Sequence, residues 1–234
     1  MMLSPTGINT YRKCPRKFYF YIKRAPTLVP AFKEALEFGK TIHEIIAHYY
    51  EIIPEDLVPD EVKIWVRKAM IDIIHDEMPE MRQRIEKQLL NFIAFEKKRL
   101  TWHMSVRPVA VEKEFVKDSV HGIVDALFRR GNDLVVVDWK TGKGQADLTD
   151  DIIVQLNVYM WLTGAKTAYA LFLEYGTFRE VPYKIDIEEL VQTIKEDKRF
   201  LPNRGSHCKF CEYQILCMRM DNLININESM WWLE

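Results

Sequence analysis

The residues best suited to chemistry are two aspartates and a lysine at the ends of two apolar segments. Asp125 ends the run Gly-Ile-Val-Asp, and Asp138 and Lys140 follow the β-branched residues 134–137 as Asp-Trp-Lys. Side chains alternate along a strand, so Asp138 and Lys140 face the same side. If the two segments pair, their carboxylates repel each other unless a cation lies between them. The pattern indicates a site for Mg²⁺ or Mn²⁺, which prefer oxygen ligands.

Lys140 would lie beside this metal site. There it could orient the attacking water and offset the charge that develops on a phosphate. An Asp-x-Lys tripeptide alone also fits solvated charges where a strand enters a turn. The buried strand before it and the Gly-x-x-Asp on a neighbouring strand favour the metal site.

Two helical segments add candidate site residues. Gly39-Lys-Thr-Ile-His43 places a histidine among isoleucines, and Gln155 and Tyr159 lie one helical turn apart. The same two segments also fit a hydrogen-bonded core histidine and an ordinary amphipathic helix.

The four patterns in order, Gly-x-x-x-His, Gly-x-x-Asp, Asp-x-Lys and Gln-x-x-x-Tyr, resemble the motif series of RecB-like nucleases in the PD-(D/E)XK superfamily. The resemblance spans residues 4–217. It implies a metal held by His43, Asp125, Asp138 and the Trp139 carbonyl, with Lys140 as the catalytic lysine. Gln155 and Tyr159 would support the site or the DNA, and a histidine ligand favours Mn²⁺ over Mg²⁺.

All four cysteines lie towards the two ends of the chain, as Cys14 and as Cys208-x-x-Cys211 followed by Cys217. Cys-x-x-Cys can chelate zinc or an iron–sulfur cluster, and the spacing alone does not choose between them. With their local contexts, one cysteine before the core and three after it resemble the iron–sulfur region of AddB-type nucleases and of CRISPR-associated exonucleases of Cas family four. The resemblance implies an iron–sulfur cluster on these cysteines, 4Fe–4S in preference to 2Fe–2S.

A short chain without a helicase region is more similar to the Cas proteins than to AddB. The resemblance then implies an exonuclease, with endonuclease activity also open, that acts on single-stranded DNA or single-stranded ends. In a CRISPR setting it would trim DNA for spacer acquisition beside the integrase proteins. A relative in DNA repair or on a mobile element would look the same. Two competing hypotheses are a DNA-binding or assembly module with a vestigial site and a zinc-stapled structural protein, and a homo-oligomer stays open.

The elements that must position these residues follow from periodicity and turn signals. Helices are expected over residues 4–21, 32–51, 61–78, 80–102, 150–162 and 186–199, and strands over 109–116, 120–128, 134–137, 168–174 and 179–183, followed by an irregular cysteine tail. This order predicts an α/β fold. The resemblance adds a mixed central sheet, an N-terminal helical insertion and a cluster region that joins both chain ends.

We expect a single nuclease domain over residues 1–234, since nearly half of the residues are hydrophobic and the chain can bury a core. Its expected parts are an N-terminal helix in 1–31, a helical region in 32–105, the nuclease core in 106–200 and the cluster tail in 201–234. Neither a signal peptide nor a membrane-spanning run is evident, so a cytoplasmic location is expected. Trp231 and Trp232 are expected to dock on this protein or on a partner.

The formal net charge of −1 means that a DNA surface must be a local concentration of basic residues. Residues 11–24 are basic without any acidic residue and are interleaved with aromatic rings. We expect phosphate contacts from Arg12, Lys13, Arg16 and Lys17, while most of the rings should belong to the core.

Overall fold

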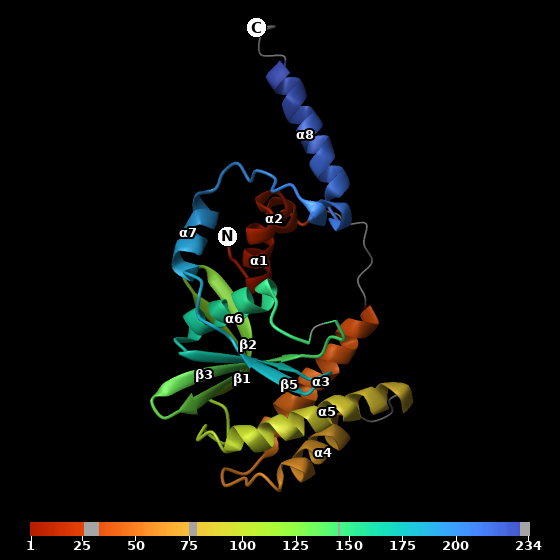
Figure 1. Ribbon diagram of the computed structural model, residues 1–234, viewed down its shortest axis with the longest axis vertical. Coiled ribbons are helices and arrows are strands. Elements are labelled where there is room, and N and C mark those ends of the chain that lie inside the picture. The colour runs from red at the N-terminus through yellow and green to blue at the C-terminus, as the bar shows by residue number, and fades with distance from the viewer. Residues whose placement is uncertain (26–32, 75–78, 145, 230–234) are drawn as a thin grey trace. The chain divides into compact units, whose positions relative to one another are not determined.

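The computed structural model describes residues 1–25, 33–74, 79–144 and 146–229 (Figure 1). The chain divides into two compact units. The core unit comprises Met1–Pro5 and Phe32–Ile187, and the terminal unit comprises Thr6–Ala31 and Glu188–Glu234. The expectation for Trp231 and Trp232 lies outside the described residues, and the single domain over 1–234 stays a prediction.

The core unit contains a five-stranded sheet in the order β1–β2–β3–β4–β5. The strands are β1 Ala110–Lys117, β2 Val120–Arg130, β3 Asp133–Lys140, β4 Thr167–Phe172 and β5 Thr177–Glu180. Only β3 and β4 run parallel, and the other neighbours are antiparallel, so the sheet is mixed. Asp118 and Ser119 both take positive φ values (48° and 69°), as a two-residue hairpin turn requires between β1 and β2.

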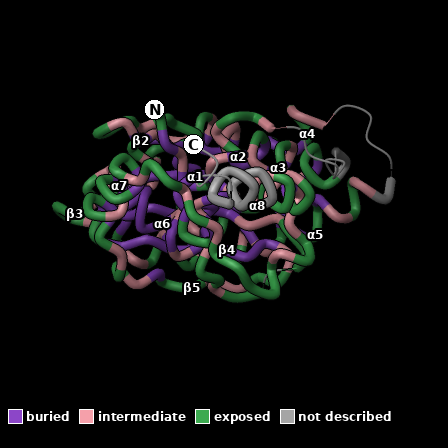
Figure 2. Tube along the Cα trace, turned by 90° about the horizontal axis from the view of Figure 1, so that it is seen from above, coloured by how far each residue is buried: buried purple, intermediate pink, exposed green. Residues whose placement is uncertain are grey.

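Helices cover both faces of this sheet (Figure 1). On one side lie α3 Lys33–Ile52 and α5 Pro79–Leu100, with α4 Val62–Ile73 packed against these two helices in the same hydrophobic cluster. On the other side lies α6 Asp150–Thr163. All six residues of β4 and seven of the fourteen in α6 are buried. Both elements show purple segments in Figure 2. Thr149 caps the start of α6 by accepting the Ile152 N–H, and Gly164 ends the helix with a φ of 75°. The expected helix over 61–78 ends earlier, at Ile73.

The terminal unit is helical. It contains most of α1 Pro5–Lys13, then α2 Pro15–Ile22, almost all of α7 Ile187–Glu196, the 3₁₀ helix η1 Ser206–Phe210 and α8 Gln214–Ser229. The single helix expected over 4–21 is therefore wrong. Cys14 takes an extended conformation (φ −162°) because a residue before proline avoids the helical region. The tail is also not irregular throughout, since α8 occupies much of it.

Aromatic contacts join the two segments of the terminal unit. Phe18 contacts Tyr11 and Phe200, with ring centroids 5.5 and 6.1 Å apart, and Phe20 contacts Tyr213 at 5.6 Å. Phe18 and Phe20 are buried, so these rings belong to the core of this unit, as expected from the sequence. Within the described ranges, no helix combines the length and apolarity needed to cross a membrane.

Candidate active site

The backbone pairing of β2 with both of its neighbours, β1 and β3, is interrupted at the level of Asp125. We call this point the opening between β1, β2 and β3. The β1–β2 ladder pairs Val111 with Ala126 and resumes with Lys113 and Val124, so residues 112 and 125 are not ladder partners. The β2–β3 ladder ends at Ala126 and Val137. Just beyond this end, the backbone N–H of Trp139 donates to Oδ2 of Asp125 at 2.8 Å. A carboxylate thus takes the place of a backbone acceptor where the strands separate.

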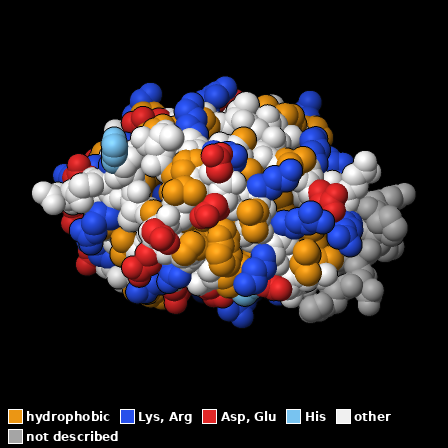
Figure 3. All heavy atoms as spheres, turned by 90° about the horizontal axis from the view of Figure 1, so that it is seen from below, with side chains coloured by type: hydrophobic (Ala, Val, Ile, Leu, Met, Phe, Trp, Pro, Cys, Tyr) orange, Lys and Arg blue, Asp and Glu red, His pale blue; other side chains and the backbone are white. Residues whose placement is uncertain are grey.

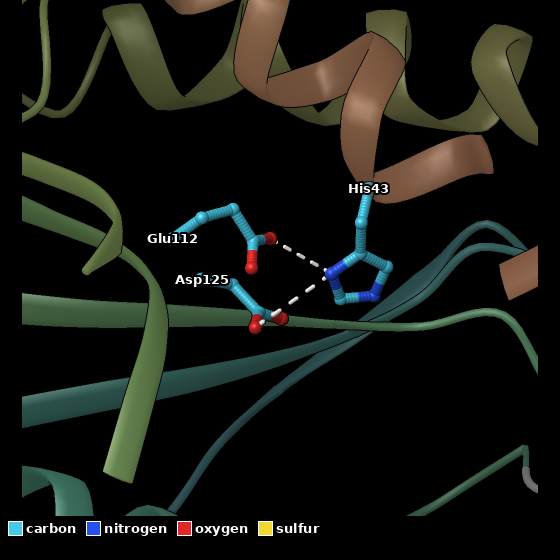
Figure 4. Close-up of side chains that lie close together, drawn as sticks. All are labelled: His43, Glu112 and Asp125. Atoms are coloured by element: carbon cyan, nitrogen blue, oxygen red, sulfur yellow. Dashed lines mark hydrogen bonds and ion pairs between the residues drawn. The ribbon is translucent and has the colours of Figure 1, made fainter. Parts of the chain in front are cut away.

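His43 reaches this opening from α3 (Figure 4). Its Nδ1 lies 2.9 Å from Oε1 of Glu112 and 3.8 Å from Oδ1 of Asp125. One ligand atom from each of these three residues lies within 4.8 Å of the others. The helix and two strands therefore bring one nitrogen and two carboxylates to a common point.

Glu112 is the site residue that the motifs missed. Its φ of 43° lies in the left-handed region, which non-glycine residues rarely adopt within a strand. No motif marks it, because a glutamate in an alternating exposed strand is ordinary. The register of the hairpin could have identified Glu112. With the turn at Asp118-Ser119, position 112 faces Asp125 across the two strands, although these two residues form no ladder pair.

The second carboxylate of the predicted pair is the most buried charge here. Asp138 is 1% exposed, and its Oδ2 lies 2.7 Å from Nζ of Lys140. That oxygen has no partner with hydrogen-bond geometry among the described residues. Lys140 Nζ donates to Oε1 of Gln155 at 2.7 Å, and Gln155 Nε2 donates to the Tyr159 hydroxyl at 2.9 Å. The lysine is thus held between Asp138 and a side chain of α6.

Crowded negative charge shifts the ionisation of this site. Burial lowers the pKa of His43, but the hydrogen bond to Glu112 and the nearby aspartates outweigh it and raise the pKa to about 9. Burial and the charge of Asp138 raise the pKa of Asp125 well above its usual value. Burial, followed by the charge of Asp138, also raises the pKa of the Tyr159 hydroxyl.

These residues fit a divalent cation. Without a metal, protons on His43 and on a carboxylate reduce the negative charge of the clustered acidic groups. A bound cation would take over this role, and its binding would release those protons. Oδ2 of Asp138 offers a buried oxygen that lacks a hydrogen bond. The donor set of carboxylate oxygens and one imidazole suits Mn²⁺ or Mg²⁺. The Trp139 carbonyl as a further ligand stays a prediction.

The glycines of two motifs permit close approaches around the site. A Cβ on Gly122 would lie 2.8 Å from Cε1 of Tyr159, and a Cβ on Gly39 would lie 3.0 Å from Oγ1 of Thr141. Glycine at these positions lets α6 approach β2 and lets α3 approach the loop after Lys140.

The four cysteines of the terminal unit line one pocket of about 230 Å³. Cys14 precedes α2, Cys208 lies in η1, Cys211 follows it and Cys217 lies in α8, and all four thiols are free. Burial, and then the charge of Asp221, raises the pKa of the Cys217 thiol. The fold therefore brings the four cysteines, from two distant segments of the sequence, to one pocket. That they hold an iron–sulfur cluster stays a prediction.

Arg16 and Lys17, which were expected to contact DNA, both form ion pairs within the terminal unit. Arg16 is 2% exposed and donates to the Phe200 carbonyl and to Asp221, so we assign it to the pocket wall. Lys17 pairs with Glu212 at 2.9 Å. Arg12 and Lys13 are exposed.

Comparison with known proteins gives one family. The model of the PD-(D/E)XK nuclease superfamily matches residues 2–218. A search of curated proteins finds no match. A solved structure titled "Crystal structure of SSO0001" is similar with 17% sequence identity and a TM-score of 0.37, covering 80% of this chain and 96% of that chain.

Proposed function

The chain belongs to the PD-(D/E)XK nuclease superfamily, and we propose that it is a metal-dependent deoxyribonuclease whose active site lies at the opening between β1, β2 and β3. The observation that carries this proposal is the buried pair Asp125 and Asp138 on adjacent strands, with Lys140 beside the second carboxylate. Two acidic groups at this depth are costly unless a cation joins them.

The residues of the site have separate roles in the proposed reaction. His43, Asp125, Asp138 and the Trp139 carbonyl would hold Mn²⁺ or Mg²⁺, and Glu112 would join them or hold His43 in place. The bound metal would polarise the scissile phosphate and activate the water that attacks it. Lys140 orients that water and stabilises charge on the phosphate as the P–O bond to the leaving nucleotide breaks. Gln155, fixed by Tyr159, keeps the lysine amine in place.

The proposed substrate is single-stranded DNA or a single-stranded end, cut as an exonuclease. Arg12 and Lys13 lie at the surface, where basic side chains can contact phosphates. The terminal unit carries twelve Lys and Arg against eight Asp and Glu, whereas the core unit carries twenty-one against twenty-six. This basic excess supports electrostatic attraction of a DNA backbone without sequence preference.

For the cysteine pocket we propose an iron–sulfur cluster, with 4Fe–4S preferred. Four thiolates around one zinc ion, each bonded at about 2.3 Å, lie about 3.8 Å apart. No three of the described thiols come within 4.8 Å of one another. The pocket of about 230 Å³, lined by all four cysteines, supports a cluster over a single ion. Arg16, Lys17 and Arg204 in the lining would offset the charge of the thiolates.

A nuclease site and an iron–sulfur cluster in one chain favour a role in trimming DNA fragments for CRISPR spacer acquisition, together with integrase proteins. The competing function is a DNA-binding or assembly module with a weak site. The complete set His43, Asp125, Asp138 and Lys140 supports the enzyme, because a vestigial site commonly loses one of its members.

A cleavage assay tests the proposal. With Mn²⁺ and end-labelled single-stranded DNA, Asp138→Ala should abolish cleavage because the metal loses its most buried carboxylate. Asp133→Ala is the matched control, since Asp133 is exposed at the far end of the same strand. Cleavage by Asp138→Ala at the wild-type rate would place the active site elsewhere.

A further inference from the structure

Helix α3 contacts the catalytic region at two points. His43 and Tyr50 are seven residues apart, which is about two helical turns, so they lie on the same face. His43 reaches Glu112 and Asp125, and Tyr50 stacks on Trp139 with ring centroids 6.1 Å apart and planes inclined by 22°. The same helix thus presents a metal ligand and a ring that packs on the strand of Asp138.

The far end of Tyr50 is anchored in a buried ion pair. Its hydroxyl donates to Oε1 of Glu96 at 2.7 Å. Arg99 donates to both oxygens of Glu96, at 2.5 and 2.9 Å, and to the carbonyls of Ser105 and Val106. Glu96 and Arg99 are 0% exposed. A buried ion pair of this kind is stable only when its hydrogen bonds are satisfied, so the network restrains the Tyr50 ring.

Trp139 depends on such packing. It is 2% exposed, and its indole N–H has no hydrogen-bond partner among the described residues. Its ring is therefore oriented by its neighbours, Tyr50 on one side and Phe92 edge-on at 5.8 Å. The backbone N–H of the same residue holds Asp125, beyond the end of the β2–β3 ladder. The residue whose ring packs on Tyr50 is therefore the residue whose peptide N–H orients this carboxylate, so a shift of Trp139 against α3 would displace both.

We propose that Tyr50 is a positioning residue that sets the register of α3 against β3. Through the stack on Trp139 it places His43 over Asp125 and fixes the peptide N–H that Asp125 accepts. The inference rests on the proposed metal site and extends it to a residue that contacts neither metal nor DNA.

Tyr49 supplies a matched control. It is as buried as Tyr50, lies beside it on α3, and donates to the other oxygen of Glu96 at 3.3 Å. Its ring contacts Tyr50 and Phe92, and no ring contact with Trp139 is found among the described residues. Tyr49→Leu and Tyr50→Leu therefore remove the same ring and the same type of hydrogen bond, but only the second removes the stack.

The experiment measures Mn²⁺ affinity by calorimetry and, without metal, exchange of the Trp139 amide by NMR. Tyr50→Leu should bind Mn²⁺ at least about tenfold more weakly, the loss that is typical when a residue supporting a metal ligand is removed. Its Trp139 amide should exchange at least about tenfold faster, while Tyr49→Leu stays within about twofold of wild type in both measurements. Tyr50→Phe, which keeps the ring, should restore most of the affinity. Should Tyr50→Leu not fold, Tyr50→Met replaces it with the same expectations.

Three results would overturn the inference: equal effects of Tyr49→Leu and Tyr50→Leu, no effect of either, or a Tyr50→Phe protein as weak as Tyr50→Leu. The metal-free measurement separates this inference from the proposed function. A wild-type protein that binds no Mn²⁺ would refute the metal site, yet selective exchange of the Trp139 amide in Tyr50→Leu would still support the positioning role.

Discussion

At the scale of single residues, Glu112 is the most informative side chain of the site. Its backbone adopts an unfavourable conformation while its carboxylate contacts His43. Strain of this kind persists only where surrounding structure enforces it, and it is common at functional sites. We therefore expect Glu112 to act on the metal site through His43 or as a ligand.

Replacing this carboxylate by an amide tests that role. Glu112→Gln should lower Mn²⁺ affinity by roughly 10- to 100-fold, the usual cost of removing a group that orients a metal ligand, with little change in melting temperature. Calorimetric titration of Mn²⁺ measures the effect.

The same strand offers the control. Glu114 lies two residues further along β1 and pairs with Nδ1 of His121 at 2.9 Å, the same distance as in the Glu112–His43 pair. Glu114→Gln should leave Mn²⁺ affinity unchanged. Equal losses in both variants would mean that net charge, not the contact with His43, decides the affinity.

The residues that motifs identify were predictable because each motif encodes a local geometry. Strand alternation brings Asp138 and Lys140 to one side, and helical spacing aligns Gln155 with Tyr159. Glu112 required the register of a whole hairpin. The basic sequence neighbours of Arg16 predict a DNA contact, and only the fold shows that its side chain is buried and donates to Asp221.

At the scale of elements, the contact between β2 and α6 depends on Gly122. A Cβ there would come within 2.8 Å of the Tyr159 ring, so α6 must shift. Gly122→Ala should lower the free energy of unfolding by about 1–3 kcal/mol, as overpacking typically does. It should also slow cleavage, because Tyr159 holds Gln155 and Gln155 holds Lys140. Denaturant unfolding and steady-state cleavage measure the two effects.

Gly144→Ala serves as the control for this prediction. A Cβ on Gly144 would meet no atom within 4 Å, and its φ is not in the left-handed region. The free energy of unfolding of Gly144→Ala should therefore equal or slightly exceed that of the wild-type protein. A Gly122→Ala protein with unchanged stability and cleavage would show that α6 tolerates the added methyl group.

Element boundaries were less predictable than element types. The strands and most helices follow from periodicity, but the break between α1 and α2 depends on a single residue, Pro15. The apolar positions on both sides of Pro15 keep helical spacing, so periodicity alone predicts one helix. The cysteines of the tail suggested an irregular ligand loop, although Cys217 lies within α8.

At the scale of the whole molecule, the net charge of −1 hides an uneven distribution between the two units. The face of the molecule seen from below in Figure 3 mixes basic, acidic and hydrophobic side chains, and the exposed apolar ones of α4 and α5 include Ile64, Ile71 and Leu90. An excess of Lys and Arg over Asp and Glu is found in the terminal unit, which also holds the cysteine pocket. Overall composition therefore hides this basic excess, whereas the division into units shows it.

The two proposed metal sites share no residue and belong to different units, so their losses should be separable. Cys14→Ala removes the thiol that precedes α2 and faces the pocket from the N-terminal segment. The protein should lose its visible absorbance and bind single-stranded DNA more weakly, because the basic segment around Arg12 is no longer tied to α8. Its melting temperature should fall by several degrees, since loss of a structural cross-link costs roughly 2–5 kcal/mol.

Asp138→Ala should give the opposite pattern. Its visible absorbance, melting temperature and DNA affinity should stay close to those of the wild-type protein, but it should not cleave DNA. Met218→Leu, which alters an exposed side chain in the pocket lining without removing a thiol, should retain colour, stability and cleavage. Absorbance, thermal melting, fluorescence anisotropy with labelled DNA and Mn²⁺-dependent cutting report these properties for each variant. A colourless Cys14→Ala protein that melts, binds and cuts as wild type does would contradict a structural cluster, because the thiols would then hold nothing that the fold requires.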